Sequence, residues 1–158
     1  MKFIIKNGDS FIEFNQVKFY KDSQDFEFNV YAKCSYFVIE DKIVYVNKLA
    51  LLNFYKQLQD CYQKLKGEVE SKFSYDEDIK LKLSFNKLGH VVVGCDFYDY
   101  AGFTNKCHIE FKTDQTFIVE TLKELKEILK IGEKISKQVW YKNLFNSLAY
   151  VQAQHNLI

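Results

Sequence analysis

Alternating apolar and polar residues dominate the first 46 positions of the chain, and this pattern predicts β-strands. The clearest case spans residues 26–34, where apolar side chains occupy every second position. A period of two is typical of a strand with one buried face, because successive side chains point to opposite faces of a sheet. Residues 11–20 predict an earlier strand that bends at its middle, and residues 21–25 predict a polar turn after it.

A tight hairpin is expected next. Residues 36–39 and 43–46 are runs of β-branched or aromatic residues, and the polar tripeptide Glu40-Asp41-Lys42 separates them. Two such runs with a short polar connection are typical of antiparallel strands joined by a turn.

The apolar period then changes to that of an α-helix. A first helix is predicted over residues 48–66, with Asn47 as its N-cap and Gly67 at its C-terminal end. A second helix is predicted to begin after Asp114, which is its expected cap. Each helix carries one apolar stripe, formed by Leu51, Phe54, Tyr55, Leu58, Tyr62 and Leu65 in the first and by Ile118, Leu122, Leu125 and Leu129 in the second.

Strand patterns return between the two helices. The predicted strands are residues 69–75, 81–85, 91–97 and 106–112, and their connections are an acidic turn at 76–78, a turn at 86–89 and a loop at 98–105. The run at 91–97 is apolar apart from Gly94 and Asp96, which favours a central place in the sheet.

These elements predict an α+β fold, because a run of strands precedes each helix. We expect one domain over residues 1–131, made of two similar halves, 1–66 and 67–131. Its antiparallel sheet should be strongly curved or folded into two layers, with two or three helices packed on it. Gly132 is expected to end the second helix, and residues 132–158 to form a C-terminal helical extension that packs on the body or docks a partner.

Composition indicates a folded protein. The 158 residues are 47% hydrophobic and 17% aromatic, which is enough material for a folded core. The chain has no apolar run near the ~18 residues of a membrane span, and its first residues do not resemble a secretory signal. A cytoplasmic protein without a membrane partner is therefore expected. The net charge of +1 and the absence of arginine argue against a nucleic-acid partner.

The four cysteines do not predict a metal site. Their spacings of 27, 34 and 12 match no zinc pattern, and no nucleotide-binding, hydrolase or metalloprotease motif occurs. The chain is therefore expected to have no catalytic residues, no cofactor and no metal, and to carry free thiols at Cys34, Cys61, Cys95 and Cys107.

The last predicted hairpin brings polar groups together. A loop centred near Ala101 would place three pairs opposite each other, namely Cys95 with Cys107, Asp96 with Lys106, and Gly94 with His108. In this register the thiols share the buried face, and the adjacent Cys107 and His108 point to opposite faces, which argues against a shared metal or nucleophile site.

The loop of this hairpin is acidic and aromatic, which suits a protein-binding site. Aromatic side chains supply most hot-spot energy in interfaces, and nearby carboxylates speed the approach of a basic partner. The candidate partner-binding residues are Asp96, Tyr98, Asp99, Tyr100 and Phe103. The alternative is that the aromatic rings fold back onto the sheet or the tail.

Beyond single motifs, the order of elements resembles a known family. The residues that carry the resemblance are the helix from Asn47 to Leu58, the segment Lys66-Gly67-Glu68-Val69-Glu70, the strands 79–85 and 89–93, and the strand from Cys107 that runs through Asp114-Gln115-Thr116 into the last helix. Over residues 24–131 the chain resembles the WapI-type immunity proteins of bacterial polymorphic toxin systems. The resemblance implies a non-enzymatic inhibitor that binds the toxin domain of a cognate effector.

Two other functions stay open from the sequence. One is a small-molecule or regulatory protein-binding module with a pocket between the sheet and its helices. The other is an enzyme that uses Asp96, His90 or His108, which would need a cleft joining these groups. A weak homodimer is also compatible with the chain.

Overall fold

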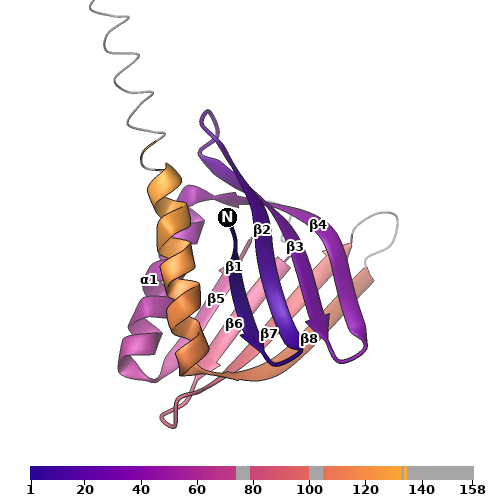
Figure 1. The fold of residues 1–158 in the computed structure, drawn as a ribbon, viewed down its shortest axis with the longest axis vertical. Helices are drawn as coiled ribbons and strands as arrows, with labels where there is room; N and C mark the ends of the chain where they lie inside the picture. The colour runs from indigo at the N-terminus through magenta and orange to yellow at the C-terminus, as the bar shows by residue number, and fades with distance from the viewer. Residues whose placement is uncertain (74–78, 100–104, 133, 135–158) are drawn as a thin grey trace, which may run out of the picture.

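Two antiparallel four-stranded sheets face each other, and two helices close the side at which β1 and β5 lie (Figure 1). The computed structural model describes residues 1–73, 79–99, 105–132 and 134. This arrangement confirms the predicted α+β class and the two-layered form of the sheet. None of the described helices is long and apolar enough to cross a membrane.

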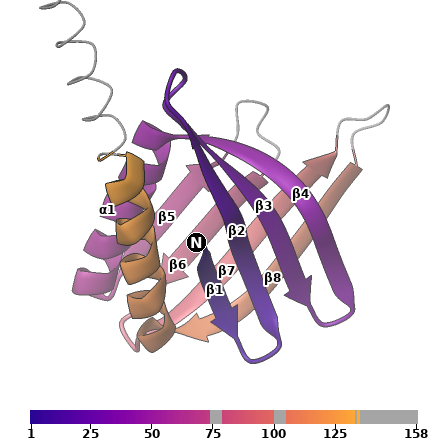
Figure 2. The same ribbon diagram turned by 45° about the horizontal axis from the view of Figure 1, so that its top comes forward.

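Each sheet is a simple up-and-down series of neighbouring strands. The first sheet contains β1 (Phe3–Asn7), β2 (Ser10–Tyr20), β3 (Asp25–Cys34) and β4 (Phe37–Asn47), and the second contains β5 (Gly67–Lys72), β6 (Ile79–Phe85), β7 (His90–Asp99) and β8 (Asn105–Asp114). Helix α1 (Lys48–Lys64) follows the first sheet, and a helix over residues 115–132 follows the second. Figure 2 shows the two layers from a second direction.

Strand β2 bends as predicted, whereas the predicted hairpin around Asp41 is wrong. The bend in β2 is a bulge between Asn15 and Lys18, with Gln16 in the left-handed region. The second segment is a single strand, β4, which pairs with β3 on both sides of a bulge near Asp41. Asp41 has a φ of 54°, and its carboxylate accepts a hydrogen bond of 2.9 Å from Asn29 Nδ2. The polar tripeptide Glu40-Asp41-Lys42 therefore forms a bulge within β4 and not a turn.

The helix caps follow the sequence prediction at both N-termini. Asn47 Oδ1 accepts a hydrogen bond of 2.9 Å from Leu49 N, and Asp114 Oδ1 accepts one of 2.9 Å from Thr116 N. The C-terminal end of α1 differs from the predicted end at Gly67, because Leu65 adopts the left-handed conformation and Gly67 already begins β5. A Cβ at Gly67 would lie 3.0 Å from Cys61 Sγ, so the glycine serves close packing of α1 on β5.

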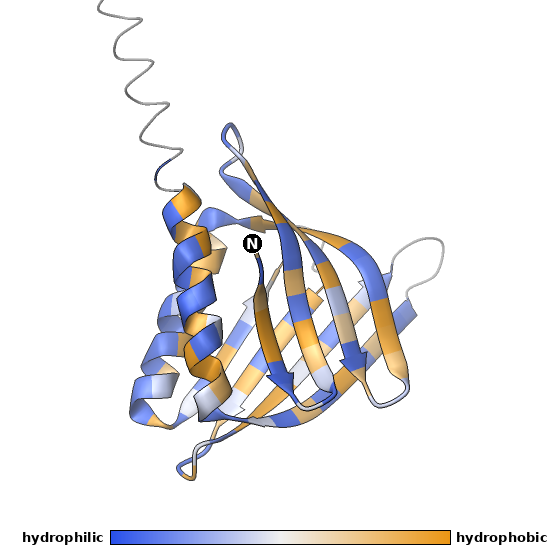
Figure 3. Ribbon diagram, in the orientation of Figure 1, coloured by the Kyte–Doolittle hydropathy of each residue, from blue (hydrophilic) through white to orange (hydrophobic). Residues whose placement is uncertain are grey.

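The core between the two layers is rich in phenylalanine. Figure 3 shows apolar and polar bands alternating along the strands, as expected for sheets with one buried face. The rings of Phe3 and Phe14 stack at 4.4 Å between centroids. Phe73 contacts both Phe14 at 5.4 Å and Phe54 of α1 at 5.0 Å, so it joins the first sheet to the helix.

Gly132 does not end the second helix as predicted. It is helical and buried, and a Cβ there would lie 3.0 Å from Phe26 Cζ and 3.3 Å from Phe19 Cε2. The glycine therefore lets the helix approach the first sheet closely. The remainder of the expected extension lies outside the described residues, apart from Lys134, and the expected boundary at residue 131 stays a prediction.

The helix over residues 115–132 covers the edge of β1. Ile4 N donates to Glu124 Oε2 at 3.0 Å, and Thr121 Oγ1 donates to Ile4 O at 2.6 Å. Thr121 is fully buried, and burial raises the pKa of Glu124. Side chains of the helix thus satisfy backbone groups that an edge strand leaves unpaired.

Candidate functional site

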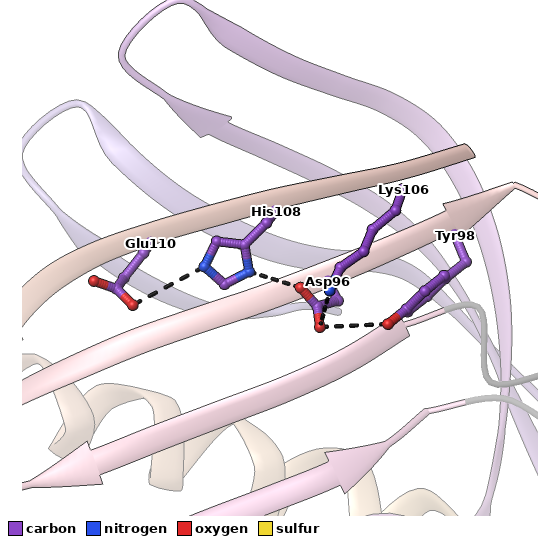
Figure 4. Close-up of polar contacts among 5 residues, drawn as sticks. All are labelled: Asp96, Tyr98, Lys106, His108 and Glu110. Atoms are coloured by element: carbon purple, nitrogen blue, oxygen red, sulfur yellow. Dashed lines mark hydrogen bonds and ion pairs between the residues drawn. The ribbon is translucent and has the colours of Figure 1, made fainter. Parts of the chain in front are cut away.

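A polar cluster lies on the outer face of the second sheet, where β7 and β8 run side by side (Figure 4). Alternation along β7 turns Cys95 and Phe97 into the core and leaves Asp96 and Tyr98 on the outer face. The same alternation along β8 buries Ile109 and Phe111 and places three polar residues beside Asp96 and Tyr98, namely Lys106, His108 and Glu110.

Asp96 is the centre of this cluster. Its Oδ1 lies 2.6 Å from His108 Nδ1, and its Oδ2 lies 3.0 Å from Lys106 Nζ. Tyr98 donates its hydroxyl hydrogen to Asp96 Oδ2 at 3.4 Å. His108 Nε2 in turn lies 4.0 Å from a carboxylate oxygen of Glu110. The cluster is thus a chain of alternating acidic and basic groups along the sheet surface.

The electrostatics of the cluster favour an ionised Asp96. Partial burial opposes ionisation, but the hydrogen bonds from His108 and Lys106 outweigh it and hold the pKa of Asp96 below its usual value. The hydrogen bond between Lys106 and Asp96 also raises the pKa of Lys106. The ammonium groups of Lys80 and Lys106 lie 5.1 and 5.5 Å from the centroid of the Tyr98 ring, which is within cation–π range.

The pairing of β7 with β8 differs from the predicted register by two residues. The structure places Asp96 opposite His108, Phe97 opposite Cys107, and Cys95 opposite Ile109. The connection is centred near residue 102, because β7 continues to Asp99 and β8 begins at Asn105. Cys95 and Cys107 therefore do not face each other, although both point inward, and His108 lies on the opposite face from Cys107.

The five predicted partner-binding residues are placed as follows. Asp96 and Tyr98 belong to strand β7 and are partly buried, and Asp99 is exposed at its end. Tyr100 and Phe103 lie outside the described residues. The prediction of a loop from residue 98 is therefore wrong for Tyr98 and Asp99, which continue the strand because residues 105–107 pair with them and with Phe97.

A groove of about 450 Å³ connects this end of the second sheet with β4. Its lining includes residues 39–42 of β4, residues 97–99 of β7 and residues 105–107 of β8. Lys42 Nζ crosses the groove and donates to Tyr98 O at 2.7 Å. Sequence reasoning missed the part of this region that β4 forms, although Tyr36, Phe37 and Val38 already stand out as consecutive apolar residues at a strand end.

Of the three groups named for a possible enzyme, His90 lies apart from the other two. His90 pairs with Asp114 at the end of β7 remote from Asp99, so it is separated from the pair of Asp96 and His108. All four cysteines are free thiols, and burial raises the pKa of Cys95. Within the described ranges, no set of three or more histidine, cysteine or acidic side chains is arranged to hold a metal. The cluster is suited to polar recognition on an open sheet surface.

Comparison with known protein families gives a match that spans most of the chain. The model of the immunity protein WapI-like family matches residues 3–131. No curated protein matches the chain. The matched stretch contains the eight strands of the described residues, α1 and nearly all of the helix over residues 115–132.

Proposed function

We propose that this chain, which belongs to the WapI-like immunity protein family, is a non-enzymatic inhibitor that binds and neutralises a cognate bacterial toxin domain. The family match over residues 3–131 is the observation that carries the proposal. The partner is a protein, and the cell that makes both proteins is protected by a stoichiometric complex.

We assign the toxin-binding surface to the end of β7 and the connection that follows it. Asp96, Tyr98 and Asp99 project from this strand, and Tyr100 and Phe103 follow in the chain. An ionised carboxylate beside aromatic side chains provides both an electrostatic attraction and an apolar anchor. A basic toxin surface fits this combination best.

The alternative of a small-molecule pocket beneath the helices is less well supported. Between the first sheet and α1 lies the fully buried ring of Phe73, which contacts both Phe14 and Phe54. A ligand in that position would have to displace this buried ring from its contacts.

The first experiment is co-expression with the protein encoded immediately upstream of this chain. We expect growth to be restored and the two proteins to co-purify in a 1:1 complex. Asp99→Lys should weaken the complex by about tenfold or more, because it places a cation against a basic partner. Asp9→Lys is the matched control, because Asp9 is an exposed aspartate in the turn between β1 and β2. A toxic neighbour that neither binds the chain nor loses toxicity would contradict the proposal.

A further inference from the structure

Strand β4 is the edge of the first sheet that no other part of the described chain covers. The order of the sheet is β1-β2-β3-β4, so β1 and β4 are its two edges. Thr121 and Glu124 bond the backbone of β1 at Ile4. In the described part of the chain, β4 pairs with β3 alone, and its other edge faces away from the helices (Figure 1). An open edge presents unpaired N–H and C=O groups to a further strand.

The open edge is also unusually apolar. Among the described residues nine large hydrophobic side chains are exposed, and five of them belong to β4 or the turn before it. Their exposed fractions are 100% for Tyr36, 64% for Phe37, 47% for Val38, 55% for Ile43 and 45% for Tyr45. Tyr20 of β2 lies 6.3 Å from Tyr45 between ring centroids and extends the same surface. Exposed apolar residues gathered in one strand indicate a binding surface.

Acidic side chains divide this apolar edge at its middle. Glu40 has no hydrogen bond or ion pair among the described residues, and Asp41 accepts a hydrogen bond from Asn29. The two lysines of the adjacent groove are already engaged, because Lys42 bonds Tyr98 O and Lys106 bonds Asp96. A cation from outside the chain would therefore find carboxylates that the chain's own lysines leave unneutralised.

We propose that the toxin partner adds an extended strand to the open edge of β4 and places a lysine or arginine against Glu40 and Asp41. This inference rests on the proposed function and names the type of segment that the partner supplies. Backbone hydrogen bonds to β4 provide affinity, and apolar side chains beside Val38 and Ile43 provide specificity. The groove that joins β4 to Tyr98 and Asp99 makes this edge continuous with the surface assigned to β7.

A second copy of the chain fits the edge less well than a basic partner. Antiparallel pairing of two β4 strands through their middles would bring both bulges together. Glu40 and Asp41 of each copy would then lie close to the same two residues of the other, and like charges opposite each other destabilise a strand pair. A partner strand with a cation at that position has the opposite effect.

The test uses the full chain and the toxin domain of the protein encoded immediately upstream. In Val38→Lys/Ile43→Lys, two exposed apolar contacts of β4 become cations, and lysine is well tolerated on an edge strand. The matched control is Leu49→Lys/Leu88→Lys, because these side chains are also apolar and exposed but lie on α1 and on the turn after β6. We expect calorimetry to show binding about 30-fold weaker for the β4 variant and within about threefold of wild type for the control.

Hydrogen exchange of the wild-type chain provides a second measurement that does not depend on the folding of any variant. We expect amide exchange in residues 37–47 to slow when the toxin domain is added. Glu40→Lys should weaken binding by about tenfold, and Glu40→Gln by less.

Three outcomes would overturn the inference. If the wild-type chain binds the toxin domain but β4 exchange and the affinity of the β4 variant are unchanged, the strand-addition surface is wrong and the proposed function stands. If the chain alone dimerises with β4 protected, the occupant is a second copy. If the wild-type chain does not bind the toxin domain, both proposals fail.

Discussion

Asp96 shows how much of the polar cluster depends on one carboxylate. His108, Lys106 and Tyr98 all contact its two oxygens, so its removal leaves three polar groups without their shared acceptor. Because Asp96 is three-quarters buried, with 23% of its side chain exposed, these contacts are screened less than those of a surface ion pair.

Asp96→Asn should lower the free energy of unfolding on the order of 1 kcal/mol at pH 7. The folded pKa of Asp96 lies below its unfolded value of about 3.9. The stabilisation is therefore fully present above that value and is lost as pH falls through the lower, folded pKa. Urea unfolding from pH 7 down to pH 3 should show the difference between wild type and variant shrinking below about pH 4. Asp9→Asn is the control, and a difference that does not change with pH would contradict the assignment.

At the residue level, sequence reasoning found the correct faces but the wrong partners. Each residue of β7 pairs with a residue of β8 two positions further along than predicted. A shift of two residues leaves every side chain on the same side of the sheet. Cys95 and Cys107 were therefore correctly expected to share the buried face, although they do not pair. The sequence does not predict the contact of Asp96 with His108, because the length of the connection after Asp99 decides it.

Among the elements, the two edges of the first sheet behave differently. Edge β1 is covered by a helix whose Thr121 donates to the carbonyl oxygen of Ile4 at 2.6 Å, and edge β4 is open. Covering β1 removes one site of unwanted strand pairing, whereas the edge of β4 stays available to a partner strand.

Thr121→Val should destabilise the chain by about 1–2 kcal/mol, because it leaves the carbonyl group of Ile4 without its buried donor. Valine keeps the shape of threonine, so packing changes little. Thermal unfolding measures the loss, and hydrogen exchange should show faster opening of β1 than of β3. Thr121→Ser keeps the hydroxyl group and should recover part of the stability. Equal effects of the two substitutions would show that packing alone matters.

Element boundaries were predictable where side chains act locally. Asn47 and Asp114 cap helices through bonds to residues only two positions away, so sequence alone identifies them. The continuous strand β4 was not predictable, because Glu40-Asp41-Lys42 has the composition of a turn, and pairing with β3 on both sides of the bulge overrides that local preference.

For the whole molecule, one core joins both sheets and both helices. Phe73 is a central link, since its fully buried ring contacts Phe14 of the first sheet and Phe54 of α1. Periodicity predicted which residues are buried, but it left open whether the sheet curves or splits into two layers. That choice depends on contacts such as this one, between residues far apart in the chain.

Phe73→Ala should lower the free energy of unfolding by about 3–5 kcal/mol, the usual cost of emptying an aromatic site in a core. Because Phe73 belongs to the second half and its ring contacts Phe14 and Phe54 of the first half, we expect both sheets to unfold in one transition at a lower denaturant concentration. Residue-resolved NMR of β3 and β7 during urea titration measures this. Separate midpoints for the two sheets would show that they are independent units.

The cover on β1 has a consequence for synthesis on the ribosome. The hydrogen bond between Thr121 and Ile4 spans 117 positions of the chain. Strand β1 leaves the ribosome early, and its edge therefore stays uncovered until the helix over residues 115–132 has been translated. Contacts of such long sequence separation form slowly, so the nascent chain passes through a period in which β1 and β4 are both open, and chaperones that bind extended segments would meet it then.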